Sequence, residues 1–124
     1  MEWIFDNLPV YQDCFELLVR ISNMIHSFPR EYKYTFGEYL QKYCAESLSE
    51  ISLATMITDK KEKIIHIEKA RQNIELLKVY WRVCKEVNIL PNTWYVSELN
   101  QMVSISKQIN SRLTFCKSKI DNDR

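Results

Sequence analysis

The chain has 124 residues and a mass of 14.9 kDa, close to the commonest size of one domain and enough to bury roughly two-thirds of its unfolded surface. Its 46% hydrophobic and 27% charged residues argue against a disordered tail or a membrane protein, and its single glycine argues against the glycine-dependent turns of β-sandwich, Rossmann and P-loop folds. The net charge of +1 lacks the strong basic excess that would by itself indicate nucleic-acid binding.

The first predicted helix spans residues 9–27. Its apolar side chains recur at three- and four-residue spacing and so share one helical face: Val10, Cys14, Leu17, Leu18, Ile21, Ile25 and Phe28. Asn7 is a candidate cap for the start of this helix. Pro29 ends it, because proline disfavours helical backbone at the preceding residue and has no amide hydrogen of its own.

The second predicted helix spans residues 35–58 and has the clearest start signal in the sequence. Thr35 and Glu38 fit a capping box, in which the hydroxyl and the carboxylate each accept from an otherwise unpaired amide. The lone glycine, Gly37, falls in the first turn, where it costs less than in the middle of a helix. The inward face is expected to carry Leu40, Tyr43, Cys44, Ser47, Leu48, Ile51 and Thr55.

The third predicted helix spans residues 60–87, and Asp59 is expected to cap it. The connection from the second helix is then only a few residues long, so the two helices must form an antiparallel αα-hairpin. The third helix ends near Asn88, ahead of Pro91. Its apolar stripe consists of Ile64, Ile67, Ala70 or Arg71, Ile74, Leu77, Trp81, Cys84 and Val87.

The fourth predicted helix spans residues 93–118, with Asn92 or Thr93 as its cap. Its stripe consists of Val96, Leu99, Val103, Ser106, Ile109, Leu113 and Cys116. Residues 119–124 are expected to form a frayed polar tail. Four amphipathic helices joined by short links predict an all-α fold, a single domain over residues 1–124 built as an antiparallel up-down-up-down four-helix bundle.

Few residues indicate catalysis or metal binding. A di-iron bundle needs a Glu-x-x-His pair on each of two helices, and the nearest approach here is Glu62 and His66, four residues apart. The serines and cysteines lack the glycine-built turn that presents a nucleophile. We therefore expect no enzyme, with no catalytic residue, metal, cofactor or small-molecule substrate.

The N-terminal sequence lacks a basic n-region, and no apolar run approaches the length of a membrane span, so we expect a cytoplasmic protein with no membrane association. In that reducing setting the four cysteines are expected to be thiols. An up-and-down bundle would place Cys14 and Cys116 near one end, Cys44 towards the middle and Cys84 near the other end. That spread is too wide for one zinc ion, so small buried core residues are the expected role.

Charge is distributed unevenly along the sequence. Residues 1–59 hold four basic and nine acidic residues, whereas residues 60–124 hold thirteen basic and seven acidic ones. Four cations of the third helix fall close to one stripe: Arg71, Lys78, Arg82 and Lys85. This stripe is either a solvated face or a phosphate-binding track, and assembly of subunits into a ring would favour the second by making the positive surface continuous.

Aromatic residues are expected to gather at the end of the bundle shared by the first and third links. They either pack that end or form an interface between chains, because aromatics are enriched at the centres of oligomer contacts. The residues concerned are Tyr32, Tyr34, Tyr39, Tyr80, Trp81, Trp94 and Tyr95.

Several segments together resemble one family of four-helix bundles. They are the link Phe28-Pro29-Arg30, the run from Tyr32 to Glu38, the run from Leu77 to Arg82 and the helix from Gln101 to Leu113. The family contains proteins encoded within 23S rRNA intervening sequences and the accessory variability determinant (Avd) proteins of diversity-generating retroelements. The resemblance covers nearly the whole chain, and its sharpest element is the aromatic-Thr-x-Gly sequence after the Phe-Pro link.

The resemblance implies a homopentamer with a basic surface that binds RNA or DNA and has no catalytic activity. In the Avd branch the partners are a reverse transcriptase and its template RNA. Lys78 and Arg82 match the basic positions of the family's third-helix motif, and weaker candidates for nucleic-acid contact are Arg71, Lys85 and Arg112. The alternative is an intervening-sequence-type bundle that assembles or scaffolds without binding nucleic acid.

Overall fold

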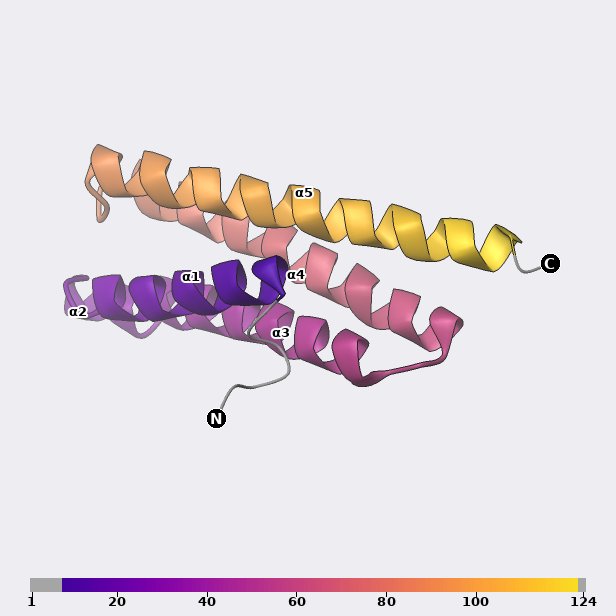
Figure 1. The fold of residues 1–124 in the computed structure, drawn as a ribbon. Helices are drawn as coiled ribbons and strands as arrows, with labels where there is room; N and C mark the ends of the chain where they lie inside the picture. The colour runs from indigo at the N-terminus through magenta and orange to yellow at the C-terminus, as the bar shows by residue number, and fades with distance from the viewer. Residues whose placement is uncertain (1–7, 123–124) are drawn as a thin grey trace.

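The computed structural model describes residues 8–122, and within that range it contains helices and no strand (Figure 1). Four helices are long and one is a single turn: α1 (Pro9–Ile25), α2 (Arg30–Lys33), α3 (Phe36–Met56), α4 (Lys60–Glu86) and α5 (Asn92–Asn122). The predicted all-α four-helix bundle is thereby confirmed. None of the helices over these residues is long and apolar enough to cross a membrane.

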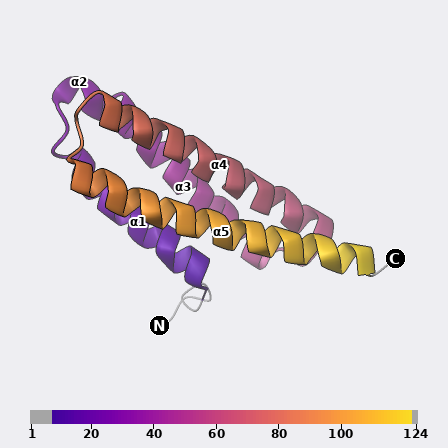
Figure 2. The same cartoon turned by 90° about the horizontal axis from the view of Figure 1, so that it is seen from above.

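The long helices pack as a four-cornered bundle. Helix α1 packs against α3 and α5, and α4 packs against the same two helices, so α1 and α4 occupy opposite corners. Figures 1 and 2 show that consecutive long helices run antiparallel. The core between them is apolar, and its largest fully buried side chains are Trp81, Leu17, Ile21, Leu40, Ile74, Leu77, Met102 and Ile105. The predicted inward stripes of the first three helices supply most of this core.

The helix boundaries follow the predicted signals in some places. The Asp59 carboxylate accepts a hydrogen bond from the Glu62 amide at 3.0 Å, which confirms the predicted cap of α4. Helix α4 ends before Asn88, whose φ of 62° lies in the left-handed region that asparagine tolerates. The amide of Ile89 then donates to the Cys84 carbonyl at 3.1 Å and closes the helix end.

The link between α1 and α3 differs from the prediction. Helix α1 ends at Ile25, and the separate turn α2 follows Pro29. The predicted capping box is wrong, because the Thr35 hydroxyl donates back to the Glu31 carbonyl at 2.9 Å. Helix α2 leaves unpaired carbonyls at its end, and the hydroxyl bonds to one of them instead of to the α3 amides. The proposed cap Asn7 lies outside the described residues.

Helix α5 is longer than predicted and rotated. It continues to Asn122, so residues 119–122 are helical rather than frayed. Near the C-terminal end of α5, Lys117 still contacts α4 through a 3.2 Å ion pair with Glu68. The predicted stripe members Val96 and Val103 are exposed, and the buried positions include Glu98, Met102 and Ile105. The stripe members Ser106, Ile109 and Leu113 are buried as predicted, and the further buried positions arise because α5 packs against both α4 and α1.

Helix α1 begins halfway along the bundle. The Gln108 amide donates to the Asp13 carboxylate at 2.8 Å, which places the start of α1 level with Arg112 on the antiparallel α5. Cys14 lies level with Cys44, its thiol 3.9 Å from the Cys44 carbonyl, so the predicted separation of these two cysteines is wrong. The prediction assumed helices that start at a common level, whereas α3, α4 and α5 continue beyond the start of α1 (Figure 1).

Packing between α1 and α3 requires glycine at position 37. Gly37 is buried in the first turn of α3, facing α1. A Cβ atom there would lie 2.8 Å from Cγ2 of Ile25 and 3.5 Å from the Tyr32 carbonyl oxygen. The absence of a side chain therefore lets α1 and α3 approach each other closely at this end.

Replacement of this glycine tests the close approach. In an ordinary helix Gly→Ala stabilises by up to about 1 kcal/mol, but Gly37→Ala is expected to destabilise by about 1 to 2 kcal/mol, because the new methyl overlaps Ile25. Urea unfolding followed by circular dichroism measures the change, with the exposed Ser49→Ala on α3 as the control. A Gly37→Ala variant at least as stable as the parent would show that the helices separate there without cost.

Candidate functional site

The predicted basic track lies on α4, and two of its four cations form ion pairs with carboxylates one turn away. The Lys78 ammonium lies 2.9 Å from a Glu75 carboxylate oxygen, and its side chain is 24% exposed. The Arg71 guanidinium lies 2.9 Å from Glu68. Both carboxylates sit three residues before their cation, a spacing that is visible in the sequence and predicts the pairing. The stripe therefore presents less positive charge than its four cations suggest.

The remaining candidates differ in setting. Arg82 is exposed and forms no ion pair with any residue of the range 8–122. The Lys85 ammonium lies 4.6 Å from the centre of the Tyr95 ring, a cation–π contact with α5. Arg112 lies on α5 and lines the groove at the start of α1, which none of the other four lines. The four α4 cations thus share one helix, whereas Arg112 belongs to another surface.

Glu68 has two cationic neighbours. The Arg71 guanidinium, with Lys117 of α5, favours the ionised carboxylate and holds the pKa of Glu68 below its usual value. Lys117 approaches from α5 at 3.2 Å. This carboxylate therefore stays charged near neutral pH and offsets positive charge from both helices.

An exposed apolar face lies on α4 and α5, and sequence analysis assigned it no function. We call it the α4–α5 face, and its members are Leu76, Val79, Val96 and Val103, which are 37 to 56% exposed. The Ser106 hydroxyl donates to the Glu75 carboxylate at 3.2 Å and fixes the level of the two helices. Val79 and Val103 each lie about one turn from that bond in the same direction, so they are at the same level on the two neighbouring helices. Large apolar side chains exposed together mark an interaction surface.

A second exposed apolar pair lies on the opposite side of the bundle. Phe15 and Val19, one turn apart on α1, are 48% and 46% exposed. Helix α1 and the neighbouring α3 also carry exposed charged residues, namely Glu16, Glu38, Glu46 and Lys42. We call this set the α1–α3 face. The α1–α3 and α4–α5 faces point away from each other, because α1 and α4 occupy opposite corners.

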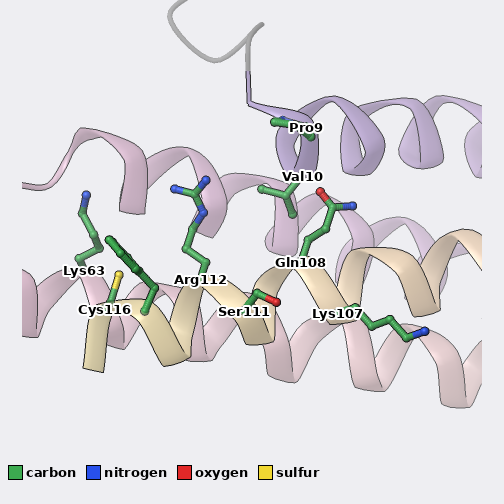
Figure 3. Close-up of a pocket in the computed structure, with 9 residues that line it drawn as sticks. Pro9, Val10, Lys63, Lys107, Gln108, Ser111, Arg112 and Cys116 are labelled. Atoms are coloured by element: carbon green, nitrogen blue, oxygen red, sulfur yellow. The ribbon is translucent and has the colours of Figure 1, made fainter. Parts of the chain in front are cut away.

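A groove opens where α1 begins. Its volume is about 600 Å³, and Pro9 and Val10 of α1 form one of its walls. Lys63 and Arg112 extend in a common direction from α4 and α5 into this region (Figure 3). The other lining residues come from α5: Lys107, Gln108, Ser111, Phe115 and Cys116. None of the residues that line it is acidic. We call it the end groove.

A buried ion pair joins α1 to α5, and no local sequence signal predicts it. The Nε of Arg20 donates to both carboxylate oxygens of Glu98 at 3.0 Å. The Glu98 side chain is 5% exposed and that of Arg20 is 35% exposed. The buried Nη2 of Arg20 has no hydrogen-bond partner among the residues described. The pair fixes the register between α1 and α5, which have few other polar contacts.

The histidine and cysteines considered as metal ligands interact with other groups in the structure. His66 contacts the Glu50 carboxylate of α3 through Nδ1, rather than pairing with Glu62. Burial raises the pKa of the Cys84 thiol to about 12, and the hydrogen bond with Cys14 together with burial raises that of Cys44. These thiols therefore stay protonated and unreactive at neutral pH. No group of three or more possible metal ligands occurs within residues 8–122.

The aromatic residues split between end packing and a helix contact. Trp81 is fully buried and donates from its indole nitrogen to the Tyr95 carbonyl at 3.0 Å. Tyr39 and Tyr43 of α3 stack on Tyr80 of α4, with ring centres 4.9 and 5.6 Å away from that ring. Most of the set thus stabilises contacts within the bundle.

The fold is a helical bundle, and its exposed faces carry apolar side chains and cations that have no ion pair among residues 8–122. No family model matches the chain, and no curated protein is significantly similar in sequence. A protein of unknown function from the S23 ribosomal protein family of Bacteroides thetaiotaomicron VPI-5482 has a similar solved structure, with a TM-score of 0.78. The likeness covers 84% of this chain and 97% of that chain at 17% identity. It shows the fold alone and is consistent with the intervening-sequence-type bundle that the resemblance implies.

The buried pair makes an asymmetric stability prediction. Arg20→Met leaves the Glu98 carboxylate buried without its partner and is expected to destabilise by about 3 kcal/mol. Glu98→Gln is expected to cost only about 1 kcal/mol, because the partly exposed guanidinium keeps access to water and to the amide oxygen. Urea unfolding of both single variants and the double variant measures the difference. An Arg20→Met variant no less stable than Glu98→Gln would contradict this account of the pair.

Proposed function

We propose that the protein is a non-enzymatic bundle that assembles with further copies of itself. The observation that carries the proposal is the presence of two exposed apolar faces on opposite sides of one bundle, the α4–α5 face and the α1–α3 face. Isolated apolar residues are normal on protein surfaces, whereas clusters of them mark contacts with other molecules. If the chains associate head to tail, the α4–α5 face of each copy meets the α1–α3 face of the next, so both faces of a chain are covered by its two neighbours.

Charge supports the head-to-tail arrangement. The segment 1–59, which supplies the α1–α3 face, has nine acidic and four basic residues, and the segment 60–124 has seven acidic and thirteen basic ones. Two α4–α5 faces would bring like charges together, whereas opposite faces attract each other and select the orientation. A head-to-tail contact forms a ring if its rotation closes. The family resemblance implies that the ring has five members.

A second candidate function is that of a nucleic-acid-binding accessory protein. The observation that favours it is Arg82, an exposed α4 cation without an ion-pair partner among residues 8–122. Assembly would repeat this cation and Lys85 around a ring, and repeated cations displace counterions from a nucleic acid. The Avd resemblance adds a reverse transcriptase and its template RNA as partners. In this reading Lys78 and Arg71 contribute less, because Glu75 and Glu68 neutralise them.

Placing a charge in the apolar part of each face tests the assembly. Val79→Glu and Phe15→Glu are each expected to reduce the mass measured by light scattering to that of a monomer, because each places a charge in a dry contact. The control is Met56→Glu, at an equally exposed apolar position at the end of α3. Circular dichroism verifies that all three variants keep their helical content.

Mixing the two variants reveals the geometry of the contact. Each variant keeps one intact face, so an equimolar mixture is expected to give heterodimers and no larger species. A Phe15→Glu variant that assembles like the parent would overturn the head-to-tail arrangement. A monomeric parent protein would overturn self-assembly altogether.

A separate measurement addresses nucleic acid. Arg82→Glu is expected to weaken binding of a fluorescein-labelled RNA hairpin, and to reduce the slope of log K against log salt by about one. Lys78→Glu is expected to have a smaller effect, because that cation is already paired with Glu75. Equal losses in the two variants would contradict the ranking, and an affinity independent of salt would remove the nucleic-acid reading.

A further inference from the structure

We propose that the end groove binds an acidic amphipathic helix from a partner protein of a different kind. The groove lies where only three long helices of the described residues run side by side, because α1 begins level with Arg112 while α5 continues to Asn122. Among residues 8–122, no segment fills the fourth corner beyond the start of α1. Helix-in-groove recognition places the apolar side of a peptide helix in such a site.

The open corner is long enough for a short helix. Helix α5 extends ten residues beyond Arg112, which is about 15 Å, or nearly three helical turns, at 1.5 Å per residue. A separate, smaller cavity shares the lining residues Val10, Lys63 and Arg112 with the end groove. Its other lining residues include Ile51 and Ala54 of α3 and Ile67 of α4, so α3 and α4 flank the same corner. A helix placed there would complete the four-cornered packing that the other half of the bundle already has.

Apolar surface is available along the groove. Phe115 of α5 is 61% exposed and lines the same groove as Pro9 and Val10 of α1. An aromatic side chain this exposed gains most of its stabilisation only when a partner covers it. This apolar wall favours an amphipathic helix, because a nucleic-acid backbone would bind the cations and leave the apolar side chains uncovered.

The charge of the groove selects an acidic partner. Lys63, Lys107 and Arg112 line it, and no lining residue is acidic. None of the three has an ion pair within residues 8–122. This contrasts with Arg71 and Lys78 on the same bundle, which neighbouring glutamates neutralise. Unpaired cations beside an apolar wall favour a partner that presents carboxylates next to apolar side chains.

The test uses a fluorescein-labelled, fourteen-residue peptide of leucine and glutamate, with leucines at three- and four-residue spacing. Fluorescence anisotropy on the full chain is expected to show saturable binding of this peptide. A permuted peptide of the same composition, without an apolar face, and a leucine–lysine peptide are expected to bind at least about tenfold more weakly. Equal binding of the permuted or the lysine peptide would overturn the proposal.

Two pairs of substitutions locate the site. Lys63→Glu with Arg112→Glu is expected to raise the Kd of the leucine–glutamate peptide at least about tenfold, and Lys63→Gln with Arg112→Gln provides a milder version that keeps the fold. The matched control is Arg82→Glu with Lys85→Glu, which removes two cations outside the groove and is expected to leave the Kd within about twofold. An equal loss in the control pair would overturn the assignment to the end groove.

Competing occupants are outcomes of the same assay. A variant without residues 1–7 that binds the peptide tenfold more tightly would assign the groove to that segment of the chain and overturn the proposal. Displacement of the peptide by an RNA hairpin, abolished in the Lys63→Glu, Arg112→Glu variant, would assign the groove to nucleic acid instead. The proposal is independent of self-assembly, because the monomeric Val79→Glu variant is expected to bind the peptide as the parent does.

Discussion

The unequal length of α1 is the constraint on which the surfaces of this bundle depend. Helix α1 has 17 residues, against 27 in α4 and 31 in α5. Four helices can share a core only where all four are present, so in the described part of the chain the apolar interior has four walls in one half of the bundle and three in the other. Gly37 and the Arg20–Glu98 pair fix where α1 lies, one by close approach to α3 and the other by register with α5. The position of the end groove follows from those contacts.

Charge is offset locally more than the sequence totals suggest. A sum over residues 60–124 gives a clear basic excess, but Glu68 and Glu75 lie within 2.9 Å of Arg71 and Lys78. A phosphate would have to compete with these carboxylates, and the potential of a surface depends on unpaired charges. Among the cations considered for binding, Arg82 of α4 and the three in the end groove have no ion-pair partner within residues 8–122. These two places differ in their apolar surroundings, which is why we propose different partners for them.

The sequence predicts the parts of this structure that depend on one helix at a time. Periodicity located the core residues of α1, α3 and α4, and Asp59 identified the start of α4, because both signals are local. The offset of α1, the rotation of α5 and the Arg20–Glu98 pair depend on how helices meet, and spacing within one helix carries no such information. The pairing of Arg71 and Lys78 was readable from the glutamates three residues before them. The end groove was not, because it results from lengths and levels of separate helices.

The exposed apolar residues of α5 form a surface that is separate from its core-facing one. Val96 and Val103 keep helical spacing on α5, yet the buried residues of that helix are Met102 and Ile105. One α5 sequence therefore serves two apolar surfaces, an inner one facing the core and an outer one facing solvent beside Val79. A stripe of this kind adds nothing to the stability of a lone bundle, since its side chains stay in water. In the assembly that we propose, this stripe would gain its stabilisation on association, and the opposite charge excess of the segment 1–59 would select the orientation in which the chains meet.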